Sequence, residues 1–323
     1  MITKIWYQPN TLKYFLYPFS LLYRLIISIR QFCYKIKLFK SYRVSAPVIV
    51  VGNITVGGTG KTPLVIALID ELKKHGFHPG IILRGYRGKS STWPQYVTAK
   101  SDPILVGDEA VLLATKTNVP VMAGPNRVKS AEKLIADYHC DVIVSDDGLQ
   151  HYALVRDIEI AVIDSSRRFG NGFCLPAGPL REPIFRLKSV DFIVANGKAR
   201  AGEFSMQFVV DNIISVVDGS VMRVDEVRAC KKIHAIAGIG NPQRFFESLR
   251  SLNLQFETTL FPDHYQFQKK DIESLQADII LMTEKDAIKC RDFEDSRLYV
   301  VAGHAVLDRR FLQIILEKIS SSR

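Results

Sequence analysis

Acidic residues are absent from the first 69 positions of this 323-residue chain. Those positions hold nine of the 43 lysines and arginines, which leaves 34 basic against 33 acidic residues in the rest. The net charge of +10 is therefore a property of the N-terminal part. A protein that binds nucleic acid over a broad face carries its basic residues across that face. The charge distribution predicts no nucleic-acid partner.

Clustered cysteines are also absent. The five cysteines lie far apart and form no CxxC motif or Cys/His cluster: Cys33, Cys140, Cys174, Cys230 and Cys290. This spacing argues against a zinc site and predicts reduced, mostly buried thiols in a cytosolic setting. A composition of 47% hydrophobic and 24% charged residues is that of a folded globular protein.

A long uncharged run is missing too, although residues 11–40 are rich in Leu, Ile, Phe and Tyr. A spanning helix needs about 20 apolar residues, and the longest uncharged run here, residues 14–23, is half that and contains Pro18. No small-residue cleavage site of a signal peptide follows. We predict that residues 1–45 form an amphipathic helical segment lying in the headgroup layer of a membrane, held partly by anionic lipid. The alternative is that these helices pack on the protein.

Short β-branched runs alternate with helical patterns along the rest of the chain. They cover residues 48–51, 81–83, 119–122, 142–144, 158–163 and 192–194, and then 234–237, 256–260, 279–282 and 298–301, before a helix at 309–319. Such alternation predicts βαβ units and an α/β fold with a doubly wound parallel sheet. We predict a core of the P-loop NTPase type over residues 46–203 and a two-stranded connector over 204–220, with a turn near Asp211 and Asn212. A smaller α/β domain over 221–323 would complete a crevice.

Residues 48–62, VIVVGNITVGGTGKT, read as a strand, a glycine-rich loop and a helix predicted to open at Pro63. Glycines let backbone N–H groups turn inward around phosphate oxygens, and a helix N-terminus adds its positive end. Lys61 is predicted to reach the β- and γ-phosphates and Thr62 to hold Mg²⁺. The predicted nucleotide-binding set is Thr55, Val56, Gly57, Gly58, Thr59, Gly60, Lys61 and Thr62. Thr55 stands where GxxxxGK[ST] has its first glycine, and a glycine-rich turn without a ligand is the alternative.

Residues 141–148, DVIVSDDG, read as an apolar strand that ends in Asp146 and Asp147. Adjacent carboxylates repel each other unless a cation lies between them, and Mg²⁺ prefers oxygen ligands. The pair therefore predicts a metal site beside the phosphate loop, with a strand end that caps the next helix as the alternative. Up to this point the residues indicate a nucleotide-dependent phosphoryl-transfer enzyme or switch.

Seven stretches together resemble one family, the tetraacyldisaccharide 4′-kinases of lipid A biosynthesis. They are VGNITVGGTGKTP at 51–63, RGYRG at 84–88, GDE at 107–109, DDGLQH at 146–151, LPAGPLREP at 175–183, FPDH at 261–264 and TEKD at 283–286. The resemblance runs over most of the chain. It implies transfer of the γ-phosphate of ATP to the 4′-hydroxyl of an acylated disaccharide 1-phosphate, at the cytoplasmic face of a bacterial inner membrane. Because an acylated lipid leaves a bilayer at a cost of about 0.8 kcal/mol per CH₂, a membrane-docked enzyme would meet it there.

A sugar hydroxyl is a poor nucleophile, so a base or an orienting carboxylate is expected on the acceptor side. Asp108 is the predicted base, and His264 is predicted to orient it across the crevice. The alternatives are a helix N-cap for Asp108 and an ordinary loop histidine for His264. The resemblance implies that Glu182 lies near the metal and that Arg181 supplies positive charge to the transferred group.

Several other polar residues have two interpretations. Arg84, Arg87 and Arg127 follow strand ends, where a doubly wound sheet binds ligands, and are predicted to hold ATP or the 1-phosphate; each could instead be a solvated surface arginine. His151 is predicted to be structural. Residues 283–286 resemble a base-reading signature of P-loop proteins, with a helix-opening turn as the equal alternative.

A P-loop GTPase or metallochaperone-type switch is the competing function. It would also need Lys61, Thr62 and the aspartate pair. It would need neither a lipid-facing helix nor the Arg181-Glu182 dipeptide.

Overall fold

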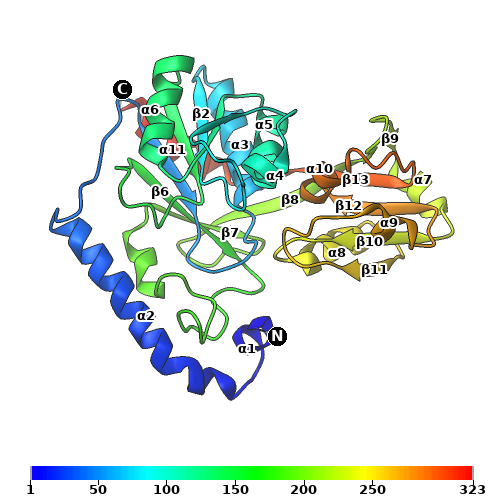
Figure 1. The fold of residues 1–323 in the computed structure, drawn as a ribbon, viewed down its shortest axis with the longest axis horizontal. Helices are drawn as coiled ribbons and strands as arrows, with labels where there is room; N and C mark the ends of the chain where they lie inside the picture. Colours follow the sequence, from blue (N-terminus) through cyan, green and yellow to red (C-terminus); the bar gives the residue numbers. More distant parts are fainter. Residues whose placement is uncertain (1, 322–323) are drawn as a thin grey trace.

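The computed structural model describes residues 2–321 and has two α/β lobes joined in one sheet (Figure 1). Met1 and residues 322–323, at the ends of the predicted first and last segments, lie outside the described residues. The chain begins with helices α1 (Ile2–Tyr7) and α2 (Leu12–Lys35). Figure 1 shows α2 along one side of the larger lobe, away from the smaller one.

The larger lobe contains strands and helices in alternation. Its strands are β1 (Val48–Gly52), β2 (Pro79–Leu83), β3 (Gln95–Val97), β4 (Val121–Ala123), β5 (Val142–Asp146), β6 (Ile158–Asp164), β7 (Phe192–Asn196) and β8 (Phe204–Ser215). Its helices are α3 (Lys61–Lys74), α4 (Pro103–Val106), α5 (Asp108–Thr117), α6 (Arg127–Tyr138) and the 3₁₀ helix η1 (Ile184–Ser189). Strands β1, β2, β5 and β6 are buried throughout because helices cover both faces of the sheet.

The smaller lobe repeats the α/β pattern. It contains β9 (Val221–Met222), α7 (Val224–Ala229), β10 (Ile233–Ala237), α8 (Pro242–Ser251), β11 (Glu257–Leu260), α9 (Lys269–Glu273), β12 (Ile279–Thr283), α10 (Glu284–Cys290) and β13 (Leu298–Leu307). The sheet order is β11-β10-β12-β13-β8-β7-β6-β1-β5-β2-β4-β3, with β9 paired to β8. Most neighbouring strands are parallel, so the predicted α/β fold with a doubly wound, mainly parallel sheet is confirmed.

The predicted turn near Asp211 and Asn212 is wrong. Strand β8 runs without a turn from Phe204 to Ser215 and pairs antiparallel with β13, which links the lobes (Figure 1). Asn212 lies opposite Ala302 and Val210 lies opposite Gly303, so Asp211 is the extra residue of a β-bulge. The two polar residues that suggested a turn therefore mark a β-bulge. The second strand of the connector is β13, which comes about 90 residues later in the chain.

The last helix does not belong to the smaller lobe, in contrast to the predicted 221–323 domain. Helix α11 (Arg309–Ser320) returns to the larger lobe and packs against α3 (Figure 1). Its buried residues Phe311, Ile315 and Ile319 share a core with Phe192 of β7. The apolar stripe of this helix predicts that one face is buried, but it does not indicate which lobe that face packs against. The other predicted domain boundaries stay predictions.

Candidate functional site

A cleft of about 990 Å³ lies between the two lobes. The carboxyl ends of β1 and β5 open into it from the larger lobe, as expected for ligand sites in doubly wound sheets. Its lining brings together residues from several predicted parts of the site: residues 56–62, Arg84, Glu109, Asp146, Asp147, Arg181, Glu182, Asp263, His264 and Lys285. Asp108 does not line the cleft but is buried beside it, in contact with His264.

The glycine-rich loop joins β1 to α3 in the predicted strand–loop–helix order. Gly57 and Gly60 have φ angles of 108° and 95°, which favour glycine. A Cβ on Gly60 would lie 2.1 Å from the amide nitrogen of Asn196, so the loop can follow this path only with glycine there. Helix α3 begins at Lys61, two residues before the predicted Pro63, because a proline in the first turn breaks no intrahelical hydrogen bond.

Two neighbouring elements fix the loop in place. The amide of Val56 donates to the carbonyl of Pro179 at 2.8 Å, and the amide of Arg181 donates to the carbonyl of Ile54 at 2.7 Å. Thr59 is buried, and its hydroxyl accepts from the Asn53 amide nitrogen at 3.2 Å. The N–H groups of the first turn of α3 have no intrahelical partners and form the kind of site that binds phosphate.

The aspartate pair lies beside the loop but the two carboxylates differ. Asp147 is 3.3 Å from the ammonium of Lys61 and accepts from Arg181 at 2.9 and 3.0 Å. Burial acts to raise the pKa of Asp147, but Lys61 and Arg181 outweigh it and hold that pKa well below its usual range. Burial, followed by the charge of Glu109, raises the pKa of Asp146 to about 7.

Arg127 is buried behind the pair and does not face solvent. Its Nη2 donates to the carbonyls of Asp146 and Asp147 at 2.9 and 2.8 Å, which fixes the backbone at the end of β5. Burial lowers the pKa of Arg127 to about 10, so it keeps its charge at neutral pH. Arg84 lines the cleft, and Arg87 donates to the carbonyl of Asp263 across it at 3.0 Å.

Glu182 is fully buried and its two oxygens already have partners. Oε2 accepts from Gln150 at 2.7 Å, while Oε1 accepts from Gln31 of α2 at 2.6 Å and from the hydroxyl of Tyr152. Within residues 2–321, no group of three or more His, Cys, Asp or Glu side chains is arranged to hold a metal ion. The metal role of Glu182 stays a prediction.

Asp108 and His264 meet where the two lobes join, as predicted. Nδ1 of His264 lies 2.9 and 3.0 Å from the two oxygens of Asp108, and both side chains are buried. Helix α5 begins at Asp108 with Gly107 as its N-cap, so the N-cap alternative for Asp108 is wrong. His264 has a φ of 61°, a strained value for a residue other than glycine. Burial acts to raise the pKa of Asp108, but His264 and Lys285 outweigh it and lower that pKa.

The structure favours the helix-opening interpretation of residues 283–286. Asp286 is fully buried, accepts from the Gly238 amide at 2.9 Å and pairs with Lys289 at 2.7 Å. Thr283 is the N-cap of α10 and accepts from the amide of Asp286. Thr283 and Asp286 therefore open a helix, which was the alternative interpretation.

Lys285, between them, is a site residue that the sequence did not predict. Its ammonium lies 3.0 Å from Glu109 and 3.2 Å from Nε2 of His264. Gln31, Gln150 and Tyr152 were missed as well. Gln150 and Lys285 lie within two of the motifs that carry the family resemblance, at 146–151 and 283–286. Gln31 has no sequence feature that marks it as functional, apart from being a polar residue in an apolar helix.

His151, predicted to be structural, lies behind the aspartate loop. Its amide donates to the carbonyl of Gly148, and its own carbonyl accepts from Arg156. Burial lowers its pKa to about 4, so the ring is neutral near pH 7.

The comparisons with known proteins all point to the same family. The model of the tetraacyldisaccharide-1-P 4′-kinase family matches residues 12–320. The chain belongs to this family. It is 50% identical over 301 residues to a tetraacyldisaccharide 4′-kinase from Nitrosococcus oceani, covering 93% of this chain and 89% of the relative. A tetraacyldisaccharide 4′-kinase from Methylobacillus flagellatus is 47% identical over 318 residues, covering 98% and 94%.

A solved structure agrees at the level of the fold. The crystal structure of LpxK from Aquifex aeolicus in complex with ATP has a TM-score of 0.79 and 29% identity, covering 96% of this chain and all of that one. The predicted family, fold class and kinase activity are confirmed, and the GTPase alternative is not favoured. ATP as the bound nucleotide is supported by the same complex.

Proposed function

We propose that this tetraacyldisaccharide 4′-kinase transfers the γ-phosphate of ATP to the 4′-hydroxyl of its acylated disaccharide 1-phosphate through the residues of the interlobe cleft. The observation that carries this proposal is the common cleft itself. The glycine-rich loop with Lys61 and the ring of His264 both line it, and His264 contacts the buried Asp108. A phosphate donor and a hydroxyl acceptor would therefore meet between them.

The residues of the phosphate side fit ATP and Mg²⁺. The glycine path leaves no room for a Cβ at Gly60, and the first turn of α3 presents N–H groups for phosphate oxygens. Thr62, Asp146 and Asp147 would hold Mg²⁺ with oxygen ligands, and one or two carboxylates suffice because phosphates and water complete the shell. When bound, Mg²⁺ would neutralise charge on the phosphate oxygens. Lys61 and Arg181 add two positive charges at the same place.

On the acceptor side, Asp108 accepts the proton of the 4′-hydroxyl as general base. Its low pKa keeps it ionised at neutral pH, which a base requires. His264 orients the carboxylate through its Nδ1 contact. Glu182 supports the phosphate side indirectly, because its partners Gln150 and Gln31 fix the segment that carries Arg181.

Helix α2 supports docking on the cytoplasmic face of the inner membrane. Among the described residues it is the one helix long and apolar enough to cross a membrane by length and composition. The side that packs on the protein uses polar groups, since Ser20, Tyr23 and Gln31 all hydrogen-bond to the larger lobe. The opposite side exposes large apolar residues: Phe15, Phe19, Leu22, Ile26 and Ile29.

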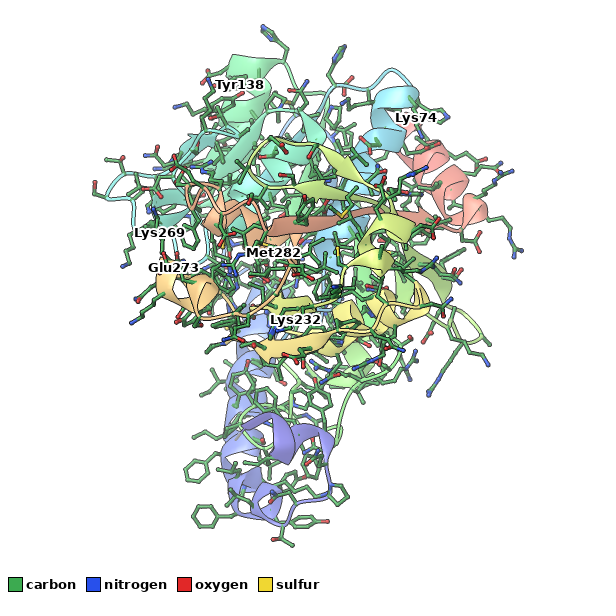
Figure 2. All side chains as sticks on the ribbon, turned by 90° about the vertical axis from the view of Figure 1, so that its right-hand side faces the viewer. Lys74, Tyr138, Lys232, Lys269, Glu273 and Met282 are labelled. Carbon is green, nitrogen blue, oxygen red and sulfur yellow. The ribbon has the colours of Figure 1, made fainter. Side chains whose placement is uncertain are left out.

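This polarity is the reverse of that of a helix on the surface of a water-soluble protein. Figure 2 shows α1 and the lower part of α2 projecting from the lobes with aromatic rings on the outside. An apolar outer face with Arg24 and Lys35 on the same helix suits the boundary between headgroups and acyl chains of anionic lipid. The inner face packs on the protein, as in the alternative interpretation, and the exposed apolar outer face supports the proposed membrane contact.

The test is a kinase assay in mixed micelles with radiolabelled γ-phosphate, Mg²⁺ and the acylated disaccharide 1-phosphate. We expect label in the lipid from the wild-type enzyme and loss of transfer of at least about 10²-fold for Lys61→Ala. Lys73→Ala, on the same helix but remote from the loop, is the matched control and should keep full activity. GTP hydrolysis that ignores the lipid would refute the proposal.

A further inference from the structure

Lys285 lies where the two lobes meet, among groups of negative charge. It comes from α10 of the smaller lobe, and its ammonium is 3.0 Å from Glu109 of α5 in the larger lobe. Asp263 is 3.8 Å away, and the Lys285 side chain is 15% exposed. Burial alone would lower the pKa of Lys285, but Glu109, Asp108 and Asp263 raise it above its usual range. The lysine is therefore a cation throughout the neutral range.

A charged lysine restricts the protonation of the histidine beside it. Its Nζ lies 3.2 Å from Nε2 of His264. An ammonium group can only donate hydrogen bonds, so Nε2 must be the acceptor and carry no proton. A neutral imidazole then has its proton on Nδ1, which lies 2.9 Å from Asp108 Oδ2. That proton is donated to the carboxylate.

We propose that Lys285 is a positioning residue that holds His264 in the tautomer with the proton on Nδ1, and thereby fixes Asp108 for the acceptor hydroxyl. This inference rests on the proposed role of Asp108 as general base. Without the ammonium, Nε2 could carry the proton, and the lone pair of Nδ1 would then face the negative carboxylate. Asp108 would lose its partner and the fixed orientation.

Glu109 completes the arrangement by holding Lys285 from the opposite lobe. The groups around Asp108 come from three segments: Glu109 on α5, Asp263 and His264 on the loop after β11, and Lys285 and Lys289 on α10. Among the described residues, Lys285 is the one cation of this group that contacts both His264 and Glu109 of the larger lobe.

The chain offers a matched control for simple bridging of the lobes. Lys116 of α5 pairs with Glu284 of α10, so it joins the same two helices as Lys285 and Glu109. Lys116 has no contact with the histidine ring among the described residues. Lys116→Met and Lys285→Met therefore each break one interlobe ion pair, and only the second removes the donor to Nε2.

The experiment measures the tautomer and the kinetics on the same full-length proteins. ¹⁵N spectra of histidine-labelled enzyme, with His264 assigned by His264→Gln, should show the Nδ1-protonated form in the wild type, in Lys116→Met and in Lys285→Arg. Lys285→Met should show a mixture of tautomers. It should lower kcat by about 10- to 100-fold, the range found when the hydrogen-bond partner that orients a metal-bound histidine is removed, with KM for ATP unchanged. The acid limb of its kcat profile should move to higher pH, since Lys285 lowers the pKa of Asp108.

A wild-type His264 protonated on Nε2 would overturn the inference, and this measurement needs no variant to fold. Unchanged kcat and tautomer in Lys285→Met would overturn it as well. So would an equal loss of kcat in Lys116→Met, because lobe bridging would then explain both variants. If Asp108→Asn kept normal turnover while Lys285→Met changed the tautomer, the role of Asp108 would fail and the assignment of the tautomer would stand.

Discussion

Asp108 and Asp147 are carboxylates of one candidate site with different neighbours. Asp147 contacts two cations, Lys61 and Arg181, whereas Asp108 contacts a histidine that is itself held by Lys285. A carboxylate that is held ionised by two cations is suited to a site that binds phosphate and a metal ion. A carboxylate with an oriented neutral donor is free to accept a further proton. The geometry thus separates two acidic groups that the sequence alone could distinguish only by family resemblance.

Replacing Asp108 by Asn tests this separation. The amide keeps the size of the side chain but cannot accept the hydroxyl proton, so kcat should fall by at least about 10²-fold. KM for ATP should stay the same, because Asp108 contacts His264 and not the glycine-rich loop in the described residues. Steady-state kinetics in micelles measure both values. Near-normal turnover would remove Asp108 from the chemistry.

Asp286 has a structural environment that its sequence motif does not reveal. Its sequence context resembles a base-reading signature, but the carboxylate is buried against Lys289 and the Gly238 amide. Asp286→Asn should leave Lys289 as a buried, unpaired charge and lower the free energy of unfolding by about 3–5 kcal/mol. Urea unfolding measures this. KM for ATP of the folded protein should not change, and a raised KM at unchanged stability would restore the base-reading interpretation.

Helix α2 has two faces with separate tasks. The inner face reaches the catalytic loop, since Gln31 donates to Glu182 and Tyr23 donates to the carbonyl of Arg181. The composition of the segment predicts an amphipathic membrane helix. It could not predict the inner face, because those partners lie about 150 positions away in sequence. Deleting residues 1–40 would therefore disturb the chemistry as well as the docking.

Variants of single faces separate the two tasks. Phe19→Ser, Leu22→Ser and Ile26→Ser together should weaken binding to vesicles with anionic lipid by more than about tenfold, because each buried apolar side chain contributes about 1.5–3 kcal/mol. Turnover of a short-chain soluble acceptor should stay normal. Gln31→Leu should do the opposite, keeping vesicle binding and lowering kcat. Sedimentation with vesicles and the kinase assay measure the two effects, and identical behaviour of both variants would contradict a two-faced helix.

The whole molecule is built by a chain that leaves the larger lobe and returns to it. The alternation of strands and helices predicted two α/β lobes with mainly parallel strands, because this pattern is local in sequence. The antiparallel pairing of β8 with β13 and the return of α11 are contacts between distant segments. The short-range sequence pattern does not indicate such contacts. The predicted smaller domain therefore included α11, which packs on the larger lobe.

The return of α11 makes the last helix part of the stability of the larger lobe. Phe311 is fully buried and its ring lies 5.4 Å from those of Phe192 and Phe204. Phe311→Ala should lower the free energy of unfolding by about 3–5 kcal/mol. Amide hydrogen exchange should become faster in α3 and β7, far from the residue in sequence but adjacent to it in space. Ile314→Ala, on the exposed side of the same helix, is the matched control and should change little. Faster exchange confined to β10 and β12 would mean that α11 serves the smaller lobe after all.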